Sequence, residues 1–343
     1  MSRPVASERV PVVTLTGHLG AGKTTLLNHL LQQPGARVGV VVNDFGDVNV
    51  DAGLVTGQID EPAAISGGCL CCLPDAGGLD AALEKLTHPR LALDVVIVEA
   101  SGIADPLTLS RMIRFSGVER VRPGGVVDVV DALEHFDTVD TGGDPPARYA
   151  VTSLVVVNKT DRLPAGHGER TLDRIEARVH ERNPAAQVVR TSHGRVDPAL
   201  VYDAAFAEDP PDQLPLAALL RDGRAHDHAH ADAVTVAAPG PISSGRLVDL
   251  LEDPPPGAYR IKGRVVVDTG RSLRGYVVHV VGRSVHVTSR RIGDADGFGE
   301  LVAIGMHLDA DQVRDRLERV LAPSDRPDAQ GFARLQRYRR LSA

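Results

Sequence analysis

The feature that most restricts the fold of this chain is the segment Gly17-His18-Leu19-Gly20-Ala21-Gly22-Lys23-Thr24. It fits the pattern G-x-x-x-x-G-K-[ST], follows the β-branched run VPVVTLT and opens KTTLLNHLLQQ, whose apolar residues have helical spacing. A strand, a glycine-rich turn and a helix in this order form a P-loop, in which backbone N–H groups and the helix N-terminus bind phosphate. This context disfavours the alternative, a glycine turn before a purely structural helix.

The side chains of this loop have distinct expected roles. Lys23 would reach the β- and γ-phosphates, and the Thr24 hydroxyl would bind Mg²⁺. These two residues, together with Glu99, are therefore the candidates for catalysis. The remaining nucleotide contacts are expected from Gly17, His18, Leu19, Gly20, Ala21, Gly22 and Thr25.

Short apolar runs alternate with amphipathic stretches from Val10 to about Thr191. The strand-like runs include RVGVVVN, DVVIVEA, GGVVDVV, TSLVVVN and AAQVVRT, and helical spacing occurs in LDAALEKL and RTLDRIEARVHER. Strands that are apolar on both faces are typical of a parallel sheet with helices on each side. The sequence therefore predicts an α/β fold of the P-loop NTPase type.

A second element of a nucleotide site is the segment DVVIVEASG. It places Glu99 at the carboxyl end of a buried strand, where α/β sheets bind ligands and where a carboxylate can hold Mg²⁺ directly or through water. Gly102 would allow the backbone to approach a γ-phosphate. The alternative is that Glu99 only caps the next segment.

The tetrapeptide Asn158-Lys159-Thr160-Asp161 follows the apolar strand SLVVV. N-K-x-D is the guanine-reading motif of P-loop GTPases. Asp161 can accept hydrogen bonds from guanine N1–H and the exocyclic amine, whereas adenine would leave this carboxylate unsatisfied. Asn158 would brace the loop, Lys159 would lie along the base, and Thr191-Ser192 would add a backbone contact.

Composition changes after about residue 207. Residues 208–232 contain several prolines and HDHAHAD, which indicates a linker, and the order of elements beyond it predicts a smaller α+β domain with a largely antiparallel sheet over residues 233–322. We therefore predict a GTPase domain at 1–207, this linker, the second domain, and a mobile tail at 323–343. His226, His228 and His230 alternate in the linker, which is either a low-affinity metal-capture site or a solvated polar segment.

Charge and hydropathy exclude some classes of function. The net charge of -7 argues against a general nucleic-acid binder, and no apolar run approaches the roughly 20 residues that span a bilayer. The N-terminus lacks the apolar core of a secretion signal, so a cytoplasmic location is expected. Clustered thiols in that compartment indicate metal or redox chemistry more often than a structural disulfide.

All 3 cysteines lie in the segment GGCLCC, as Cys69, Cys71 and Cys72. Thiolates favour zinc or Co²⁺, and tetrahedral zinc needs a fourth donor. Asp47 is the first candidate, and a water or a ligand from another protein is the alternative. Packing in a tight turn and redox chemistry are the competing readings, although adjacent cysteines form only a strained bridge.

These motifs, in this order, resemble those of the CobW-like GTPases, a family of metal chaperones and metalloenzyme activators. GHLGAGKTTLLN, VNDFGDVNVD and EASGIADP resemble the family's motifs, with departures at His18, Asp44, Asp47 and Ala100. YRIKGRVVVD and ELVAIGMHLDADQVRDRLERVL resemble its carboxy-terminal domain, although GPISSGRL replaces the usual R-P-F-H-P segment. The resemblance covers about residues 10–322.

The resemblance implies GTP binding, slow hydrolysis to GDP, and a metal site at C-x-C-C that is coupled to the nucleotide state. We expect a zinc metallochaperone that uses Mg²⁺ for hydrolysis and transfers zinc to a client metalloprotein. The alternatives are cobalt delivery to cobalamin or nitrile-hydratase machinery, and a regulatory GTPase that acts through protein binding. A homodimer is compatible with the sequence, which does not identify the client. Asp47 and Glu99 are the two candidates for positioning the attacking water.

Overall fold

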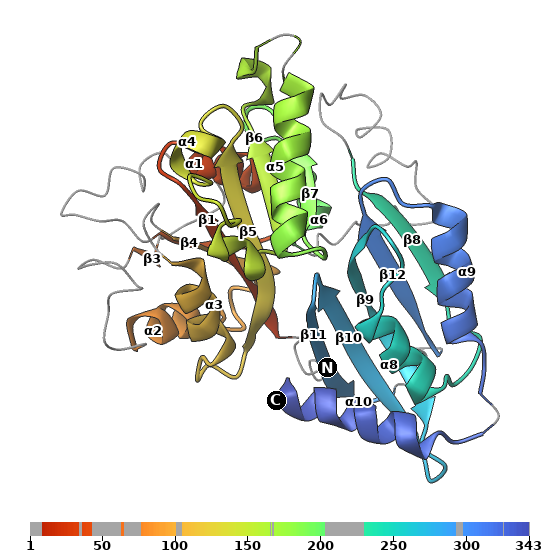
Figure 1. The fold of residues 1–343 in the computed structure, drawn as a ribbon. Coiled ribbons are helices and arrows are strands. Elements are labelled where there is room, and N and C mark those ends of the chain that lie inside the picture. The colour runs from red at the N-terminus through yellow and green to blue at the C-terminus, as the bar shows by residue number, and fades with distance from the viewer. Residues whose placement is uncertain are drawn as a thin grey trace, which may run out of the picture. The chain divides into compact units, whose positions relative to one another are not determined.

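The chain folds into two compact units, each with its own sheet (Figure 1). The structure, a computed structural model, describes residues 9–33, 36–42, 63–64, 77–100, 105–164, 166, 168–202, 230–292, 298–324 and 326–342. Arg9–Asn183 and Val188–His230 belong to the first unit, and Ala231–Ala343 to the second. The domain boundary predicted at residues 207 and 208 lies outside the described residues.

The first unit is built on a seven-stranded sheet with the order β3-β2-β4-β1-β5-β6-β7. Its strands are β1 (Val10–Gly17), β2 (Val38–Val42), β3 (Ala63–Ala64), β4 (Val95–Glu99), β5 (Val121–Asp131), β6 (Leu154–Asn158) and β7 (Gln187–Arg190). The pairings of β1 with β4 and β5, of β2 with β3 and β4, and of β5 with β6 are all parallel. The carboxyl ends of the central strands therefore meet at one edge of the sheet, as predicted.

Helices cover both faces of this sheet, which confirms the predicted α/β fold (Figure 1). They are α1 (Lys23–Leu31), α2 (Gly77–Leu86), α3 (Pro106–Arg114), α4 (His135–Thr138), α5 (Gly168–Arg182) and α6 (Pro198–Val201), with the 3₁₀ turns η2 (Ala147–Ala150) and η3 (Thr160–Arg162). Leu83 of α2 and Leu109 of α3 pack with Val96 and Val98 of β4 in one core. The sequence analysis missed α3, which the Asp105 carboxylate caps by accepting from two backbone N–H groups.

The second unit is an antiparallel sheet with the order β11-β10-β9-β12-β8 and helices on one face. Its strands are β8 (Asp232–Ala237), β9 (Ala258–Asp268), β10 (Leu273–Val281), β11 (Ser284–Arg290) and β12 (Gly299–Gly305), and its helices are α8 (Ser244–Glu252), α9 (Ala310–Leu321) and α10 (Ala329–Leu341). Leu247 of α8, Leu317 of α9 and Leu335 of α10 share one core with the sheet. The α+β character and the antiparallel pairing agree with the sequence analysis.

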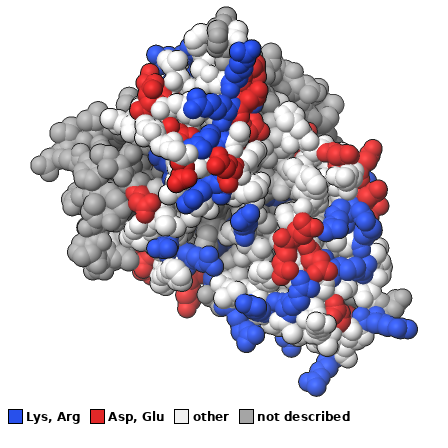
Figure 2. Space-filling view, in the orientation of Figure 1, with Lys and Arg blue, Asp and Glu red and all other residues white. Residues whose placement is uncertain are grey.

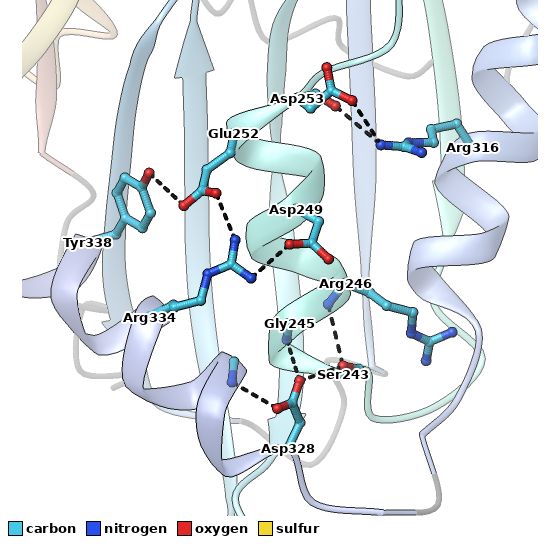
Figure 3. A network of polar contacts seen from close by, with 11 residues as sticks. Ser243, Gly245, Arg246, Asp249, Glu252, Asp253, Arg316, Asp328, Arg334 and Tyr338 are labelled. Carbon is cyan, nitrogen blue, oxygen red and sulfur yellow. Dashed lines mark hydrogen bonds and ion pairs between the residues drawn. The ribbon is translucent and has the colours of Figure 1, made fainter.

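Helix α10 lies in the tail, where the sequence analysis predicted no helix. The Asp328 carboxylate caps it by accepting from Gly331 N–H at 2.8 Å, and also accepts from Gly245 N–H at 2.8 Å and Ser243 Oγ at 3.0 Å, at the start of α8 (Figure 3). Farther along, Arg334 contacts two carboxylates of α8 at 2.8 and 2.7 Å. Helix α10 is therefore held to the start of α8 by Asp328 and to the later part of α8 by Arg334.

Charged side chains of both signs lie next to one another on the face drawn in Figure 2. Exposed ion pairs also occur along α5, where Arg190 contacts Glu169, Asp173 and Glu176 at 3.0, 2.7 and 2.9 Å. Such exposed pairs contribute little to stability, about 0–1 kcal/mol each. Within the described part of the chain, no helix combines the length and apolar character that a membrane crossing requires.

A buried histidine anchors the turn after β5. His135 is 0% exposed, with Nδ1 3.5 Å from the Tyr149 hydroxyl and Nε2 3.9 Å from the Asp140 carboxylate, which Arg178 also contacts. Burial lowers the pKa of His135 to about 4, although Asp140 acts in the opposite direction. The imidazole is therefore neutral in the folded protein above about pH 4.

This histidine should make the first unit less stable in mild acid. Because the unfolded chain binds a proton at His135 near pH 6.5 and the folded chain only near pH 4, stability is complete above pH 6.5 and is lost as the pH falls towards 4. At about 1.4 kcal/mol per pKa unit, the loss from this residue reaches about 3 kcal/mol. Urea unfolding of His135→Gln across this range should show a shallower pH dependence than the wild type.

The exposed His88 provides the matched control for that measurement. His88→Gln should retain the pH dependence of the wild type. A pH dependence that is the same in both variants would contradict the assignment to His135.

Candidate nucleotide site

The segment between β1 and α1 forms a P-loop. Gly20 and Gly22 have φ values of 80° and 107°, in the left-handed region that favours glycine, and the Ala21 N–H donates to the His18 carbonyl at 3.1 Å. Lys23 Nζ donates to the carbonyls of Gly17 at 3.0 Å and His18 at 3.4 Å. The predicted phosphate-binding residues are thus brought together in one loop.

The other side chains of the loop differ in exposure. Leu19 is 81% exposed at the tip, Thr25 is exposed, and Thr24 is partly buried at the start of α1. Ala21 is buried under the loop. The predicted role of the Thr24 hydroxyl as a Mg²⁺ ligand stays a prediction.

Asn158 joins the P-loop to the loop after β7. Its Nδ2 donates to the Ala21 carbonyl at 3.0 Å, and its Oδ1 accepts from Gly194 N–H at 2.9 Å. The side chain is only 2% exposed, so both partners depend on it. A Cβ on Gly22 would lie 2.3 Å from Asn158 Nδ2, which explains why a glycine is needed there beyond its φ angle.

Lys159 and Asp161 continue the same motif. Lys159 has a φ of 62°, and its Nζ lies 2.6 Å from the Asp131 carboxylate at the end of β5. The Asp161 side chain is 43% exposed, which leaves its carboxylate accessible to a base. Its backbone N–H donates to Ser192 Oγ at 3.2 Å.

The segment Thr191–Gly194 packs against this motif, while the backbone contact of Thr191 and Ser192 to the base stays a prediction. The Thr160 N–H and Oγ1 both reach the Thr191 carbonyl at 3.2 Å. Gly194 has a φ of 64°, and a Cβ there would lie 2.8 Å from the Leu26 backbone nitrogen of α1. The segment Thr191–Gly194, called the base-side loop below, therefore lies directly against α1, the helix that begins at the P-loop.

Glu99 lies at the carboxyl end of β4, in register with Leu15 of β1. The side chain is 5% exposed, and the next residue continues the pairing through Ala100 N–H to the Leu15 carbonyl at 2.8 Å. The carboxylate is therefore buried beside the strand that leads into the P-loop, and its role as a Mg²⁺ ligand stays a prediction.

Sequence reasoning missed three charged residues of the site: Asp128, Asp131 and Arg148. Asp128 and Asp131 lie in β5, and Arg148 from η2 contacts Asp128 at 2.8 Å and Thr16 Oγ1 at 3.0 Å. The signal was the run GGVVDVVDA, because two acids in an otherwise apolar strand need compensating partners. Gly194 was also missed, and no local pattern marks it.

Several predicted residues lie outside the described part of the chain. They are Asp47, Cys69, Cys71, Cys72, Gly102, His226 and His228. His230 is described, and its Nδ1 lies 3.5 Å from the Asp197 carboxylate. Among the described residues, no three His, Cys, Asp or Glu side chains are grouped to hold a metal ion.

Family models match both units of the chain. The model of the CobW/HypB/UreG nucleotide-binding domain matches residues 11–190, which include the P-loop and the Asn158 motif. The chain belongs to this CobW/HypB/UreG family. The model of the cobalamin synthesis protein CobW C-terminal domain matches residues 231–321.

Relatives of this CobW/HypB/UreG family member include two zinc chaperones. It is 32% identical to zinc chaperone YjiA of Escherichia coli (strain K12) over 202 residues. This alignment covers 57% of this chain and 61% of YjiA. It is 27% identical over 354 residues to zinc chaperone CobW of a Sinorhizobium species, which covers 90% of this chain and 96% of the relative.

A crystal structure of Zn(II)-bound YjiA GTPase from E. coli aligns with 92% of this chain and 99% of that one, at 22% identity and a TM-score of 0.43. The assignment of the fold rests on the strand order and on the P-loop itself, rather than on this superposition.

Two neighbouring glycines test the role of Asn158. Gly22→Ala should push Asn158 off the Ala21 carbonyl and weaken nucleotide binding at least tenfold, because the clash adds to the strain of a positive φ. Gly20→Ala is the matched control, since its φ is 80° but a Cβ would meet nothing within 4 Å. Fluorescent-nucleotide titration should show a much smaller loss for Gly20→Ala, and equal losses would contradict the role of Asn158.

Proposed function

We propose that the protein is a GTP-binding and GTP-hydrolysing metallochaperone, which binds zinc through Cys69, Cys71 and Cys72 and transfers it to a client protein. The observation that carries the GTPase part is the site in which Asn158 links the phosphate loop to the base-side loop. The zinc part rests on the cysteine cluster and on relatives named as zinc chaperones.

Guanine is the proposed base because of Asp161. Its carboxylate is accessible, while the backbone around it is held by Ser192 and Thr191. Two N–H groups on one edge of guanine match two carboxylate oxygens, and adenine offers no such pair. Lys159, held by Asp131 at 2.6 Å, would support the face of the base with its aliphatic stem.

The residues around the phosphate position fit Mg²⁺. The Thr24 hydroxyl and the Glu99 carboxylate are hard oxygen donors. Thr24 lies in the first turn of α1, and Glu99 ends β4 beside β1, the strand that leads into the P-loop. Mg²⁺ would neutralise charge on the phosphates. Lys23 would exchange the Gly17 and His18 carbonyls for β- and γ-phosphate oxygens, so the described conformation keeps this cation close to where it acts.

Water would attack the γ-phosphate in line, with the P-loop N–H groups and Lys23 stabilising the developing charge. We expect slow turnover without a client and faster turnover with one. Three thiolates would leave one zinc position for Asp47, a water or a client donor, which suits a carrier that has to release its metal.

Base selectivity gives the first test. The wild type should bind GTP in strong preference to ATP. Asp161→Asn should weaken GTP binding by at least tenfold and improve binding of xanthosine triphosphate, because the amide can donate to the xanthine oxygen. Isothermal titration with the three nucleotides measures this, and equal affinity of the wild type for GTP and ATP would exclude guanine specificity.

Coupling between nucleotide and metal gives the second test. Zinc affinity at buffered free metal should differ between the GTP-analogue and GDP states by about fivefold or more, the size of typical allosteric coupling. Changing the three cysteines to serine should abolish high-affinity binding. Equal zinc affinity in both states would remove the coupling, and cobalt bound in preference to zinc would favour cobalt delivery.

The same triple variant separates a chaperone from a regulatory GTPase. If the serine variant still bound metal and complemented a deletion strain, the cysteines would be incidental. The protein would then be a regulatory GTPase that acts through protein binding.

A further inference from the structure

A buried ion pair lies directly behind the P-loop. Asp128 of β5 is 0% exposed and is the register partner of Thr16, the residue before the first P-loop glycine. Arg148 approaches it from η2, with Nη2 2.8 Å from Oδ1 and Nε 2.8 Å from Oδ2. Oδ1 accepts a hydrogen bond from Nη2, whereas Oδ2 and Nε lie within ion-pair distance without hydrogen-bond geometry.

The pair is tied to the loop by a further contact and by close backbone packing. Arg148 Nη2 also donates to Thr16 Oγ1 at 3.0 Å. Val129, next to Asp128, lies so close to the loop that a Cβ on Gly17 would be 2.4 Å from its carbonyl oxygen. The Gly17 carbonyl is in turn the acceptor of the Lys23 ammonium at 3.0 Å.

Asp128 and Lys23 also act on each other electrostatically. Burial raises the pKa of Asp128, whereas Arg148 and then Lys23 lower it. In a water-poor interior such charges act strongly on one another. The guanidinium keeps its charge at any physiological pH, so it neutralises Asp128 permanently.

We propose that Arg148 is a positioning residue for nucleoside triphosphate binding, because it compensates the Asp128 carboxylate and lets Lys23 turn to the β- and γ-phosphates. This inference rests on the proposed nucleotide site. Without the guanidinium, the buried carboxylate attracts the Lys23 ammonium and repels the phosphates. Both effects grow with the charge of the ligand, so a triphosphate is affected more than a diphosphate.

The chain contains a matched control pair in the same unit. Arg178 contacts Asp140 at 2.7 and 2.9 Å, with side-chain exposures of 18% and 2%, against 17% and 0% for Arg148 and Asp128. This second pair joins α5 to the segment after α4, and among the described residues its hydrogen bonds do not reach the P-loop. It therefore reports what losing a buried arginine does to stability alone.

The experiment measures Kd for a non-hydrolysable GTP analogue and for GDP with Mg²⁺, together with the melting temperature of each variant. Arg148→Gln should weaken binding of the analogue about tenfold and of GDP less, whereas Arg178→Gln should leave both within about twofold. Asp128→Asn should bind the analogue at least as tightly as the wild type. The double variant D128N/R148Q should return to the wild-type value.

Three results would overturn the inference: wild-type affinity in folded Arg148→Gln, equal losses for the analogue and GDP, or a double variant no better than Arg148→Gln. If Arg148→Gln does not fold, Asp128→Asn decides, since weaker analogue binding contradicts the proposal. A wild type that prefers ATP would refute only the proposed guanine specificity. The affinities of the same variants would then be measured with a non-hydrolysable ATP analogue and with ADP. A wild type that binds no nucleotide would overturn both.

Discussion

The first unit depends on the two hydrogen bonds of the Asn158 amide. One carboxamide donates to the phosphate loop and accepts from the base-side loop, so three segments separated by 137 and 36 residues become one site. The buried amide has few other partners available, and losing either bond leaves a buried backbone group unsatisfied, at a cost of about 1–3 kcal/mol. The glycine at position 22 is part of the same constraint, because its missing Cβ is where the Asn158 nitrogen lies.

Acidic side chains at the ends of the central strands give the site its electrostatic character. Glu99 ends β4, while Asp128 and Asp131 lie in the last four residues of β5, beside the strand that enters the P-loop. Arg148 and Lys159 compensate the two aspartates. Buried ion pairs are weak sources of stability, since apolar replacements are often equally stable. Their place at the proposed phosphate and base positions is better explained by the electrostatics of binding.

Local patterns predicted most of the fold and the nucleotide-binding motifs. The strand, turn and helix around Lys23, and the alternation of apolar strands with helices, needed no knowledge of distant contacts. The hydrogen bonds from Asn158 to Ala21 and from Arg148 to Thr16 were not predictable in this way, because each joins residues more than 100 positions apart. Helix α10 was missed since four arginines interrupt its apolar spacing, and its inward face rests on Leu335 with Phe332 and Tyr338. The zinc ligands remain predictions.

The register of the sheet gives the proposed coupling a physical route. Val42, the last residue of β2, is the partner of Glu99 at the end of β4, and Leu15 of β1 is the partner of Glu99 on its other side. The segment that carries Asp47 therefore leaves the sheet beside the carboxylate proposed to hold Mg²⁺. The same connection leads through the cysteines to α2, which is packed on β4. The described elements that flank this connection, β2 and α2, thus both pack with β4, the strand that ends at Glu99.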